Sequence, residues 1–452
     1  MPSREAAVAA PSRRLPAVSR FLDEPRVAAF ESLFGRQTLK QHIDAVLEAA
    51  RTSHSAPAFE SLVASVLGRI QLAHGQTLQS VINATGVLLH TNLGRAPLAP
   101  SAIQALQNIG SGYSNLEYDL DRGARSSRYA HAVSLITAVS LAEDALVVNN
   151  CAAAVLLVLD TFAKGRDVVV ARSELIEIGG GFRLPEVLER TGARLVEAGA
   201  TNKVYLRDYE RALSARTALL MRAHPSNYEI SGFTHSVSPK ELATLGKRAG
   251  IVVIEDLGGG ALVDLTEYGL PHERTVQEAI ADGIDLVTFS GDKMLAGPQA
   301  GIIAGRRSLI ARLRSNPLLR ALRVDKLTLA ALSESLRLTL SPKRRDEIPF
   351  YRMLRTTENE MRARASAYIQ ELPDALVVSS IAYAGGGSLP QSAIASIALS
   401  LAPRHGADRA ATRLRRATPP IVARIENGRL LLDLRTIAPE QDALVIAALR
   451  GI

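Results

Sequence analysis

Ile251-Val-Val-Ile254-Glu-Asp256-Leu-Gly-Gly-Gly260 is the stretch that decides the fold, because it places a carboxylate directly after a short apolar run. Similar runs are Ala145-Leu-Val-Val148, Asp167-Val-Val-Val170, Ala218-Leu-Leu-Met221 and Asp285-Leu-Val-Thr288. Such runs, alternating with helical stretches, are typical of strands that are buried on both faces. We therefore predict an α/β fold with a parallel sheet covered by helices, in which the functional residues follow the strands.

One of the predicted helices carries clear boundary signals. Ser238-Pro239-Lys240-Glu241 combines an N-cap serine, a proline at the first helical position and a capping-box glutamate. Gly250 suits the end of this helix, because glycine tolerates the left-handed conformation that is common there. The sequence therefore predicts a helix between Pro239 and Gly250.

The chain has 452 residues, which exceeds what one hydrophobic core usually covers. Residues 1–75 have apolar positions at helical spacing, which predicts a small helical N-terminal domain. Residues 76–345 contain the alternation of strands and helices, and we expect them to form a large domain. Residues 346–452 are less regular and predict a small C-terminal α+β domain, in which Gly385-Gly386-Gly387-Ser388 indicates a linker or a tight turn.

Composition narrows the class of protein. Apolar residues make up 47% of the chain and charged residues 22%, without an apolar run long enough to cross a bilayer, so we expect no membrane association. Residues 1–5 lack the pattern of a secretory signal, which makes the cytoplasm the expected location. Cys151 is the single cysteine, so neither a disulfide framework nor a cysteine-based metal site is expected, and we predict no bound metal.

Two residues at predicted strand ends suggest pyridoxal-phosphate chemistry. Asp256 follows one apolar run, and Lys293 follows the next within Ser290-Gly291-Asp292-Lys293. A pyridoxal-phosphate site needs a lysine to form an imine and an acid to keep the pyridine nitrogen protonated, so that the ring can draw electrons. Alone, such an aspartate is usually a cap or a surface group, and such a lysine is usually solvated. Their order and their position after strands favour the cofactor site.

Further residues are predicted to bind the same cofactor. They are Asn150, Cys151, Ala152, Ser290, Ser226 and Asn227. The first three lie where a strand gives way to a helix of small residues, and a helix N-terminus presents free N–H groups and a positive dipole end to a phosphate. The hydroxyl of Ser290 is predicted to bind the same phosphate, and Ser226 or Asn227 to bind the ring hydroxyl.

Longer motifs carry a resemblance to a known family. They are Asn83-Ala-Thr-Gly-Val-Leu-Leu-His90-Thr91-Asn92-Leu93-Gly94-Arg95-Ala96-Pro97-Leu98, Ser126-Ser127-Arg128, Ile254-Glu-Asp256-Leu-Gly-Gly-Gly260 and Ser290-Gly-Asp-Lys293 with Gly297-Pro-Gln-Ala-Gly301. Over nearly its whole length, the chain resembles the bacterial selenocysteine synthases, which are L-seryl-tRNA(Sec) selenium transferases. The resemblance implies fold type I of the pyridoxal-phosphate enzymes, an aminotransferase-like architecture, with Lys293 as the Schiff-base residue of the large domain.

The resemblance also implies a reaction. In this family serine on tRNA(Sec) loses its hydroxyl through a pyridoxal-phosphate aldimine and a dehydroalanyl-tRNA intermediate, and selenophosphate then supplies selenium to give selenocysteinyl-tRNA(Sec). Lys293 would take the α-proton, and Asp256 would keep the ring an effective electron sink. The family further implies a homodecamer of five dimers and tRNA binding by residues 1–75.

Selenophosphate is a small, dense anion, which the paired donors of arginine suit well. The predicted ligands are Arg95 and Arg128, each inside a matching motif, followed by Arg125, His90 and Arg320. A structural ion pair is the alternative for Arg95. The carboxyl group of seryl-tRNA is an uncharged ester, so arginines near the β-carbon are free to bind the selenium donor.

Charge gives modest support for an RNA partner. The formal net charge is +8, and residues 305–345 contain eleven lysines and arginines against two acids. Residues 1–75 contain nine basic and seven acidic residues, so tRNA recognition there would depend on shape or on one basic face. Ordinary helix packing is the alternative for this domain.

Two other functions are compatible with these residues. A pyridoxal-phosphate lyase or dehydratase acting on a free small amino acid or an amino sugar acid would share the fold, because fold alone does not fix function. The predicted N-terminal domain argues against it. A tRNA-binding protein without catalysis is the second possibility, and the presence of both Lys293 and Asp256 argues against that.

Overall fold

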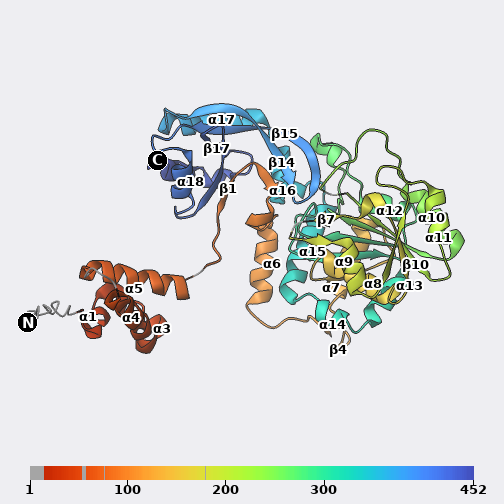
Figure 1. Cartoon of the computed structure of the whole chain (residues 1–452), viewed down its shortest axis with the longest axis horizontal. Coiled ribbons are helices and arrows are strands. Elements are labelled where there is room, and N and C mark those ends of the chain that lie inside the picture. The colour runs from red at the N-terminus through yellow and green to blue at the C-terminus, as the bar shows by residue number, and fades with distance from the viewer. Residues whose placement is uncertain (1–14, 53–56, 76, 179, 226) are drawn as a thin grey trace, which may run out of the picture. The chain divides into compact units, whose positions relative to one another are not determined.

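The computed structural model describes residues 15–52, 57–75, 77–178, 180–225 and 227–452 (Figure 1). The chain divides into two compact units, residues 1–80 and residues 81–452. The second unit contains two separate large sheets. The division into domains at residues 75 and 345 stays a prediction.

All secondary-structure elements in the described part of the first unit are helices. Its helices are α1 (Val18–Leu22), α2 (Pro25–Ala28), α3 (Glu31–Phe34), α4 (Arg36–Arg51) and α5 (Phe59–His74). In α4, Leu39, Ile43 and Leu47 recur every four residues and are buried against the apolar face of α5. The prediction of a small helical N-terminal region is confirmed.

The larger sheet of the second unit is mostly parallel. Its strands, in spatial order, are β5 (Asp144–Val148), β13 (Gly301–Gly305), β12 (Leu286–Ser290), β11 (Val252–Gly258), β10 (Thr217–Ala223), β6 (Asp167–Ala171) and β9 (Arg194–Ala198). The five apolar runs all form strands, as predicted. The predicted parallel sheet has one antiparallel strand, β13, which lies between β5 and β12. The carboxyl ends of β5, β12 and β11 therefore lie at one edge.

Helices cover both faces of this sheet, because neighbouring residues of each strand point to opposite sides. Val147 and Val287 pack on the side of α7 (Ala130–Ser140), α11 (Pro239–Ala249), α12 (Val276–Ala281) and α15 (Lys326–Leu340). Leu146 and Leu286 pack on the side of α8 (Cys151–Phe162), α9 (Leu184–Arg190) and α13 (Arg307–Ser315). This two-sided burial explains why the strands are continuously apolar.

The predicted boundaries of α11 are confirmed. The side chain of Ser238 accepts a hydrogen bond from the Glu241 backbone, and the Glu241 carboxylate accepts one from the Ser238 backbone at 2.9 Å. Gly250 ends the helix in the left-handed conformation, with φ of 65°. These signals are local, which is why the sequence alone locates both ends.

The smaller sheet of the second unit combines the end of the chain with an earlier segment. Its strands, in spatial order, are β1 (Ile82–Ala84), β16 (Ile421–Glu426), β17 (Arg429–Asp433), β15 (Ser388–Leu401), β14 (Leu376–Gly385) and β2 (Val87–Leu89). Helices α17 (Glu358–Glu371), α18 (Ala407–Leu414) and α19 (Asp442–Leu449) pack on it. The predicted α+β character is confirmed, and β1 and β2 join it from the segment expected in the large domain.

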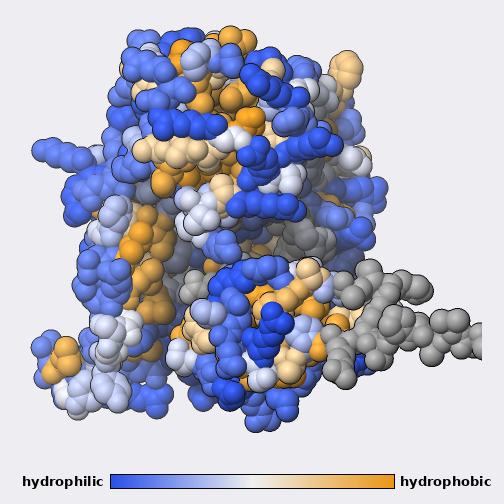
Figure 2. Space-filling view, turned by 90° about the vertical axis from the view of Figure 1, so that its left-hand side faces the viewer, coloured by the Kyte–Doolittle hydropathy of each residue, from blue (hydrophilic) through white to orange (hydrophobic). Residues whose placement is uncertain are grey.

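The remaining elements connect these layers. They are α6 (Pro100–Gly110), α10 (Leu206–Ala212), α14 (Leu319–Leu322), α16 (Pro349–Arg355), the ribbons β3 (Tyr118–Asp119) with β4 (Ala124–Arg125) and β7 (Glu177–Ile178) with β8 (Phe182–Arg183), and the 3-10 turns η1 (Thr91–Leu93), η2 (Arg172–Glu174), η3 (Leu265–Tyr268), η4 (Arg345–Glu347) and η5 (Pro439–Gln441). Figure 2 shows hydrophilic residues over much of the face that it presents, interspersed with apolar ones. Among the described helices, none has the length and apolar character needed to cross a bilayer.

Candidate active site

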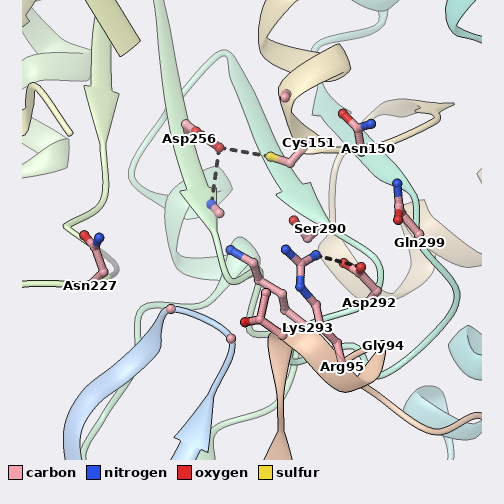
Figure 3. A pocket seen from close by; sticks show the side chains of 15 residues that line it. Gly94, Arg95, Asn150, Cys151, Asn227, Asp256, Ser290, Asp292, Lys293 and Gln299 are labelled. Carbon is pink, nitrogen blue, oxygen red and sulfur yellow. Dashed lines mark hydrogen bonds and ion pairs between the residues drawn. The ribbon is translucent and has the colours of Figure 1, made fainter. Parts of the chain in front are cut away.

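A pocket of about 630 Å³ lies beyond the carboxyl ends of β5, β11 and β12, and we call it the lysine pocket (Figure 3). Its described lining residues are Thr91, Gly94, Arg95, Asn150, Cys151, Ala152, Asn227, Asp256, Gly258, Ser290, Asp292, Lys293, Gln299, Gly386 and Gly387. The pocket thus brings together eight of the predicted site residues: Lys293, Asp256, Asn150, Cys151, Ala152, Ser290, Asn227 and Arg95.

Lys293 follows β12 in a tight turn and is only 6% exposed. Its amine has no hydrogen-bond or ion-pair partner among the described residues, and Figure 3 shows it pointing into the pocket. The end of β11 lies close by, since a Cβ on Gly258 would be 3.8 Å from Nζ of Lys293. A buried amine without a partner is costly, which suits a group that reacts with a bound molecule.

Asp256 is held by one of its two carboxylate oxygens. Oδ1 accepts hydrogen bonds from the Cys151 thiol at 3.2 Å (Figure 3), the Thr288 hydroxyl at 2.8 Å and the Gly258 backbone at 3.2 Å. Oδ2 accepts none from the described residues, so it is free for another donor. Burial raises the pKa of Asp256 above its usual range, while the bonds from Cys151 and Thr288 oppose that rise.

The start of α8 forms the predicted anion cradle. The side chain of Asn150 caps the helix by accepting a hydrogen bond from the Ala153 backbone at 2.9 Å. The backbone N–H groups of Cys151 and Ala152 lie in the first turn, where the helix offers them no carbonyl partner. Ser290, the last residue of β12, is 5% exposed and lines the same pocket. This combination of N–H groups and a hydroxyl suits a phosphate.

Gly301, the first residue of β13, permits the close approach of this cradle to the sheet. A Cβ at this position would lie 2.0 Å from the Asn150 carbonyl oxygen and 2.9 Å from the Cys151 nitrogen. Both are backbone atoms, which cannot move away by a side-chain rotation, so only glycine fits here.

Cys151 has a thiol of low reactivity. Burial, together with the adjacent carboxylate of Asp256, raises the pKa of the thiol well above its usual range. The thiol donates its hydrogen bond to Asp256 and therefore helps to orient the carboxylate.

Arg95 lies at the mouth of the pocket in a left-handed conformation, with φ of 63°. Its Nη1 donates to Oδ2 of Asp292 at 2.7 Å, and its side chain is 31% exposed (Figure 3). The ion pair considered for Arg95 is therefore present, and it lies in the pocket. Because only Nη1 is used among the described contacts, the rest of the guanidinium can bind an anion.

Arg128 and Arg125 are not among the described residues that line the pocket. Arg128 donates to Oε1 of Glu117 at 2.5 and 2.9 Å and to the Val324 carbonyl at 2.6 Å, so each of its three guanidinium nitrogens makes a hydrogen bond. Arg125 is exposed and lies 3.4 Å from Glu117. Within a single chain, the predicted role of these two arginines as anion ligands has no geometric support.

The other predicted residues also lie outside the described lining. His90 is half-buried and directly precedes Thr91, which does line the pocket. Arg320 is exposed on α14. Ser226 lies outside the described residues. Its neighbour Asn227 lines the pocket and donates to the Glu177 carbonyl at 2.9 Å.

Several lining residues were not predicted as site residues. Gly386 and Gly387 form the turn between β14 and β15, with φ of 68° and 71°, and this turn reaches the pocket. Their glycine run indicated a turn but not its position in space. Asp292 and Gln299 stand within motifs that carry the family resemblance, which was the available signal for them.

The arrangement fits pyridoxal phosphate. It offers a buried amine without a partner, a carboxylate with one free oxygen and a helix N-terminus with free N–H groups, all in one pocket. These are the three kinds of group that the cofactor's aldehyde, ring nitrogen and phosphate require.

Comparisons with known proteins agree with this geometry. Residues 81–438 match the family model described as L-seryl-tRNA selenium transferase, and residues 13–51 match the one described as selenocysteine synthase N terminal. The chain is similar to the L-seryl-tRNA(Sec) selenium transferase of Moorella thermoacetica, with 46% identity over 97% of this chain and 96% of that protein. The enzyme of Hyphomonas neptunium is 44% identical over 97% of this chain and 98% of its own length.

A solved structure is similar in fold. The D-glucosaminate-6-phosphate ammonia-lyase superposes with a TM-score of 0.59 at 21% identity, covering 84% of this chain and 97% of that one. Together with the family match, this likeness confirms the predicted fold class.

Proposed function

The chain belongs to the L-seryl-tRNA selenium transferase family, and we propose that its lysine pocket converts L-seryl-tRNA(Sec) to L-selenocysteinyl-tRNA(Sec). The observation that carries the proposal is the convergence of three groups in one pocket: the buried amine of Lys293, the buried carboxylate of Asp256 and the guanidinium of Arg95. A lysine and a carboxylate are the groups needed to eliminate the serine hydroxyl, and an arginine is suited to bind an anionic selenium donor.

Pyridoxal phosphate is the cofactor, and when bound it supplies an electron sink for the α-carbon of serine. We propose that Lys293 holds it covalently, that Asp256 binds the ring nitrogen, and that the start of α8 and Ser290 bind its phosphate. Asn227 would bind the ring hydroxyl. Supporting this assignment, all of these groups line one pocket.

Two residues would manage protons during the elimination. The Lys293 amine has no described partner, so it is free to take the α-proton of serine and to return a proton to the departing hydroxyl. Asp256 would hold the proton of the ring nitrogen through its free Oδ2, while Thr288 and Cys151 keep Oδ1 in place. The product of this step would be a dehydroalanyl ester on the tRNA.

Arg95 would bind the selenium donor, which we propose is selenophosphate. Its ion pair with Asp292 fixes the orientation of the guanidinium and leaves its other N–H groups without a described partner in a residue that lines the pocket. The serine carboxyl is esterified to the tRNA and needs no arginine, so Arg95 remains available for an anion. Substitution Arg95→Lys keeps the charge but loses the paired donors, and it should raise the KM for selenophosphate more than that for seryl-tRNA.

Assembly and location are also proposals. We propose a homodecamer of five dimers that acts in the cytoplasm, with the helical N-terminal unit as a tRNA-binding module. The fully exposed Tyr113 and the 72% exposed Leu120 support contact with a second copy. Light scattering should give ten times the chain mass of 48.4 kDa. Substitutions Lys40→Glu and Arg69→Glu, at exposed positions of α4 and α5, should weaken tRNA(Sec) binding.

The proposed function is tested by supplying selenophosphate with seryl-tRNA(Sec), seryl-tRNA(Ser) or free serine in parallel reactions. We expect selenocysteine only on tRNA(Sec), with the Lys293→Ala variant as the inactive control. Turnover of free serine alone would instead favour a lyase on small molecules, and the absence of any selenocysteine product would refute the proposal.

A further inference from the structure

A second pocket, of about 870 Å³, adjoins the lysine pocket, and we call it the carboxyl pocket. Its described lining residues are Ser173, Glu174, Thr201, Asn202, Arg222, His224, Pro225, Tyr228, Glu229, Ile230, Thr234, His235, Ser236, Gly269, Pro271, His272, Glu273, Leu389, Ser392 and Ala393. No step of the proposed reaction uses these residues. Its volume falls within the range of about 300–1,000 Å³ that is usual for small-molecule sites.

The two pockets share two walls. One wall is the segment after β10, where Asn227 lines the lysine pocket and Tyr228 lines the carboxyl pocket. The backbone N–H of His224 donates to the main-chain carbonyl of Asp256 at 2.9 Å, which connects this wall to the strand that carries Asp256. The other wall is the β14–β15 hairpin, which places its glycine turn in one pocket and Leu389 in the other.

The two pockets differ in charge. The lysine pocket contains Lys293 and Arg95 and suits anions. The carboxyl pocket contains three glutamates against the single arginine, Arg222, with histidines nearby. Arg222 is itself within 3.6 Å of Glu174 and 3.8 Å of Glu255. An anionic selenium donor is therefore disfavoured here, and an uncharged polar molecule is favoured.

Glu273 is one of the polar groups in this pocket without a described hydrogen-bond partner, as are Nη1 of Arg222 and Nδ1 of His224. Glu273 is 8% exposed, and its carboxyl accepts no hydrogen bond from the described residues; the His224 ring lies 3.9 Å away, and burial lowers the pKa of that ring, which disfavours its charged form. Burial raises the pKa of Glu273 to about 7. A ligand N–H group would satisfy this carboxyl, because a buried acceptor without a donor costs free energy.

The lining also offers a flat surface for a ring. Tyr228 is half-buried, and its hydroxyl donates to the Ser173 carbonyl, which fixes the orientation of the ring. His235 is stacked on Tyr205 at 4.3 Å between ring centroids and presents a further ring to the pocket. Aromatic rings beside hydrogen-bonding side chains are how proteins hold unpaired nucleobases.

We propose that the carboxyl pocket binds the 3′-terminal adenosine of the substrate tRNA. This inference rests on the proposed function, because the serine of seryl-tRNA is esterified to the ribose of that nucleoside. When the serine amine reaches Lys293, the ribose and its base must lie immediately beside the lysine pocket. The carboxyl pocket is that neighbouring space, and Glu273 would accept a hydrogen bond from the exocyclic amine of adenine.

The test compares two substrate mimics on the holoenzyme: serine methyl ester and adenosine carrying serine through a stable 3′-amide bond. Their dissociation constants are measured from the change in the visible absorption of the cofactor. We expect the adenosine mimic to bind about tenfold more tightly or better, because stacking and one hydrogen bond are added. Adenosine alone should compete with the adenosine mimic and not with the methyl ester.

Substitutions in the carboxyl pocket test whether the preference for the adenosine mimic arises there. Glu273→Leu removes the acceptor and should abolish most of the preference, whereas Glu273→Gln keeps a carbonyl acceptor and should retain most of it. Ser392→Trp should fill the pocket and weaken binding of the adenosine mimic alone. Glu186→Gln, at an exposed position of α9 outside the lining of both pockets, is the matched control and should behave as wild type.

Equal affinity of the wild-type enzyme for both mimics would overturn the inference. It would also be overturned if the Glu273→Leu and Ser392→Trp proteins both fold and both keep the full preference for the adenosine mimic. The same preparations are assayed with seryl-tRNA(Sec) and selenophosphate. If the wild-type enzyme forms selenocysteinyl-tRNA(Sec) yet shows no preference for the adenosine mimic, the pocket assignment fails and the proposed function stands. If it forms no product at all, the proposed function fails.

Discussion

Substitution Gly301→Ala should damage the fold and the cofactor site together. The added Cβ would lie 2.0 Å from the Asn150 carbonyl oxygen and 2.3 Å from its carbonyl carbon, whereas ordinary contact begins at 3.4 Å. The backbone must therefore separate by more than about 1 Å. Gly301 is also paired with Val148 in the sheet, so either that pairing or the start of α8 must give way. We expect a loss of about 3 kcal/mol in the free energy of unfolding, near the upper end for overpacking.

The measurement is urea denaturation of the apoenzyme, followed by titration with pyridoxal phosphate. Because Asn150 caps α8 and the next two N–H groups form the cradle, we expect cofactor affinity to fall by about tenfold or more. Gly112→Ala is the control, since no atom lies near its Cβ position and its φ is ordinary. The prediction is contradicted if the free energy of unfolding of Gly301→Ala is within about 0.5 kcal/mol of the wild-type value and the variant binds the cofactor equally well.

Three further predictions concern the ionisable groups. Lys293→Ala should abolish the visible absorption of the bound cofactor and selenium transfer while leaving the thermal unfolding temperature nearly unchanged; retained turnover would contradict it. Thr288→Val removes a hydrogen bond worth about 1.5–3 kcal/mol to the Asp256 carboxylate, so the pKa of Asp256 should rise further and the acidic limb of the activity profile should move to higher pH. An acidic limb at the same pH as in the wild-type enzyme would contradict that role for Thr288. Burial raises the pKa of both Glu174 and Glu273 to about 7, so their contribution to stability is complete below about pH 4.5 and is lost as the pH rises through about 7. The unfolding free energy should fall by about 3 kcal/mol for each carboxyl over that range, and Glu174→Gln with Glu273→Gln should flatten the profile.

Local signals account for what the sequence predicts well. The five apolar runs become strands because each is short and buried on both faces, and the ends of α11 follow from Ser238, Glu241 and Gly250. Asp256 and Lys293 could be paired because parallel strands bring their carboxyl ends to one edge. These inferences need only neighbouring residues and one rule about sheets.

Long-range placement accounts for what the sequence does not predict. The glycine turn at residues 385–387 reaches the lysine pocket because β14 pairs with β2, whose residues lie almost three hundred positions earlier in the chain. Nothing near the turn encodes that pairing. The contacts of Arg128 are a second example: nothing in its motif indicates that Glu117 and the Val324 carbonyl accept hydrogen bonds from its guanidinium, and its role as an anion ligand stays a prediction. A side chain's partners depend on which segments the fold brings beside it.

The two adjoining pockets would separate the two proposed substrates by charge. Seryl-tRNA is a polyanion, but its reactive end is an uncharged ester on a nucleoside, whereas the proposed selenium donor is a compact anion. Lys293 and Arg95 would attract the anion to the reacting carbon, and the glutamates beside Glu273 would keep it out of the space meant for the nucleoside. On this view the buried carboxyls of the second pocket, which cost stability above neutral pH, serve to keep the two substrates in separate places.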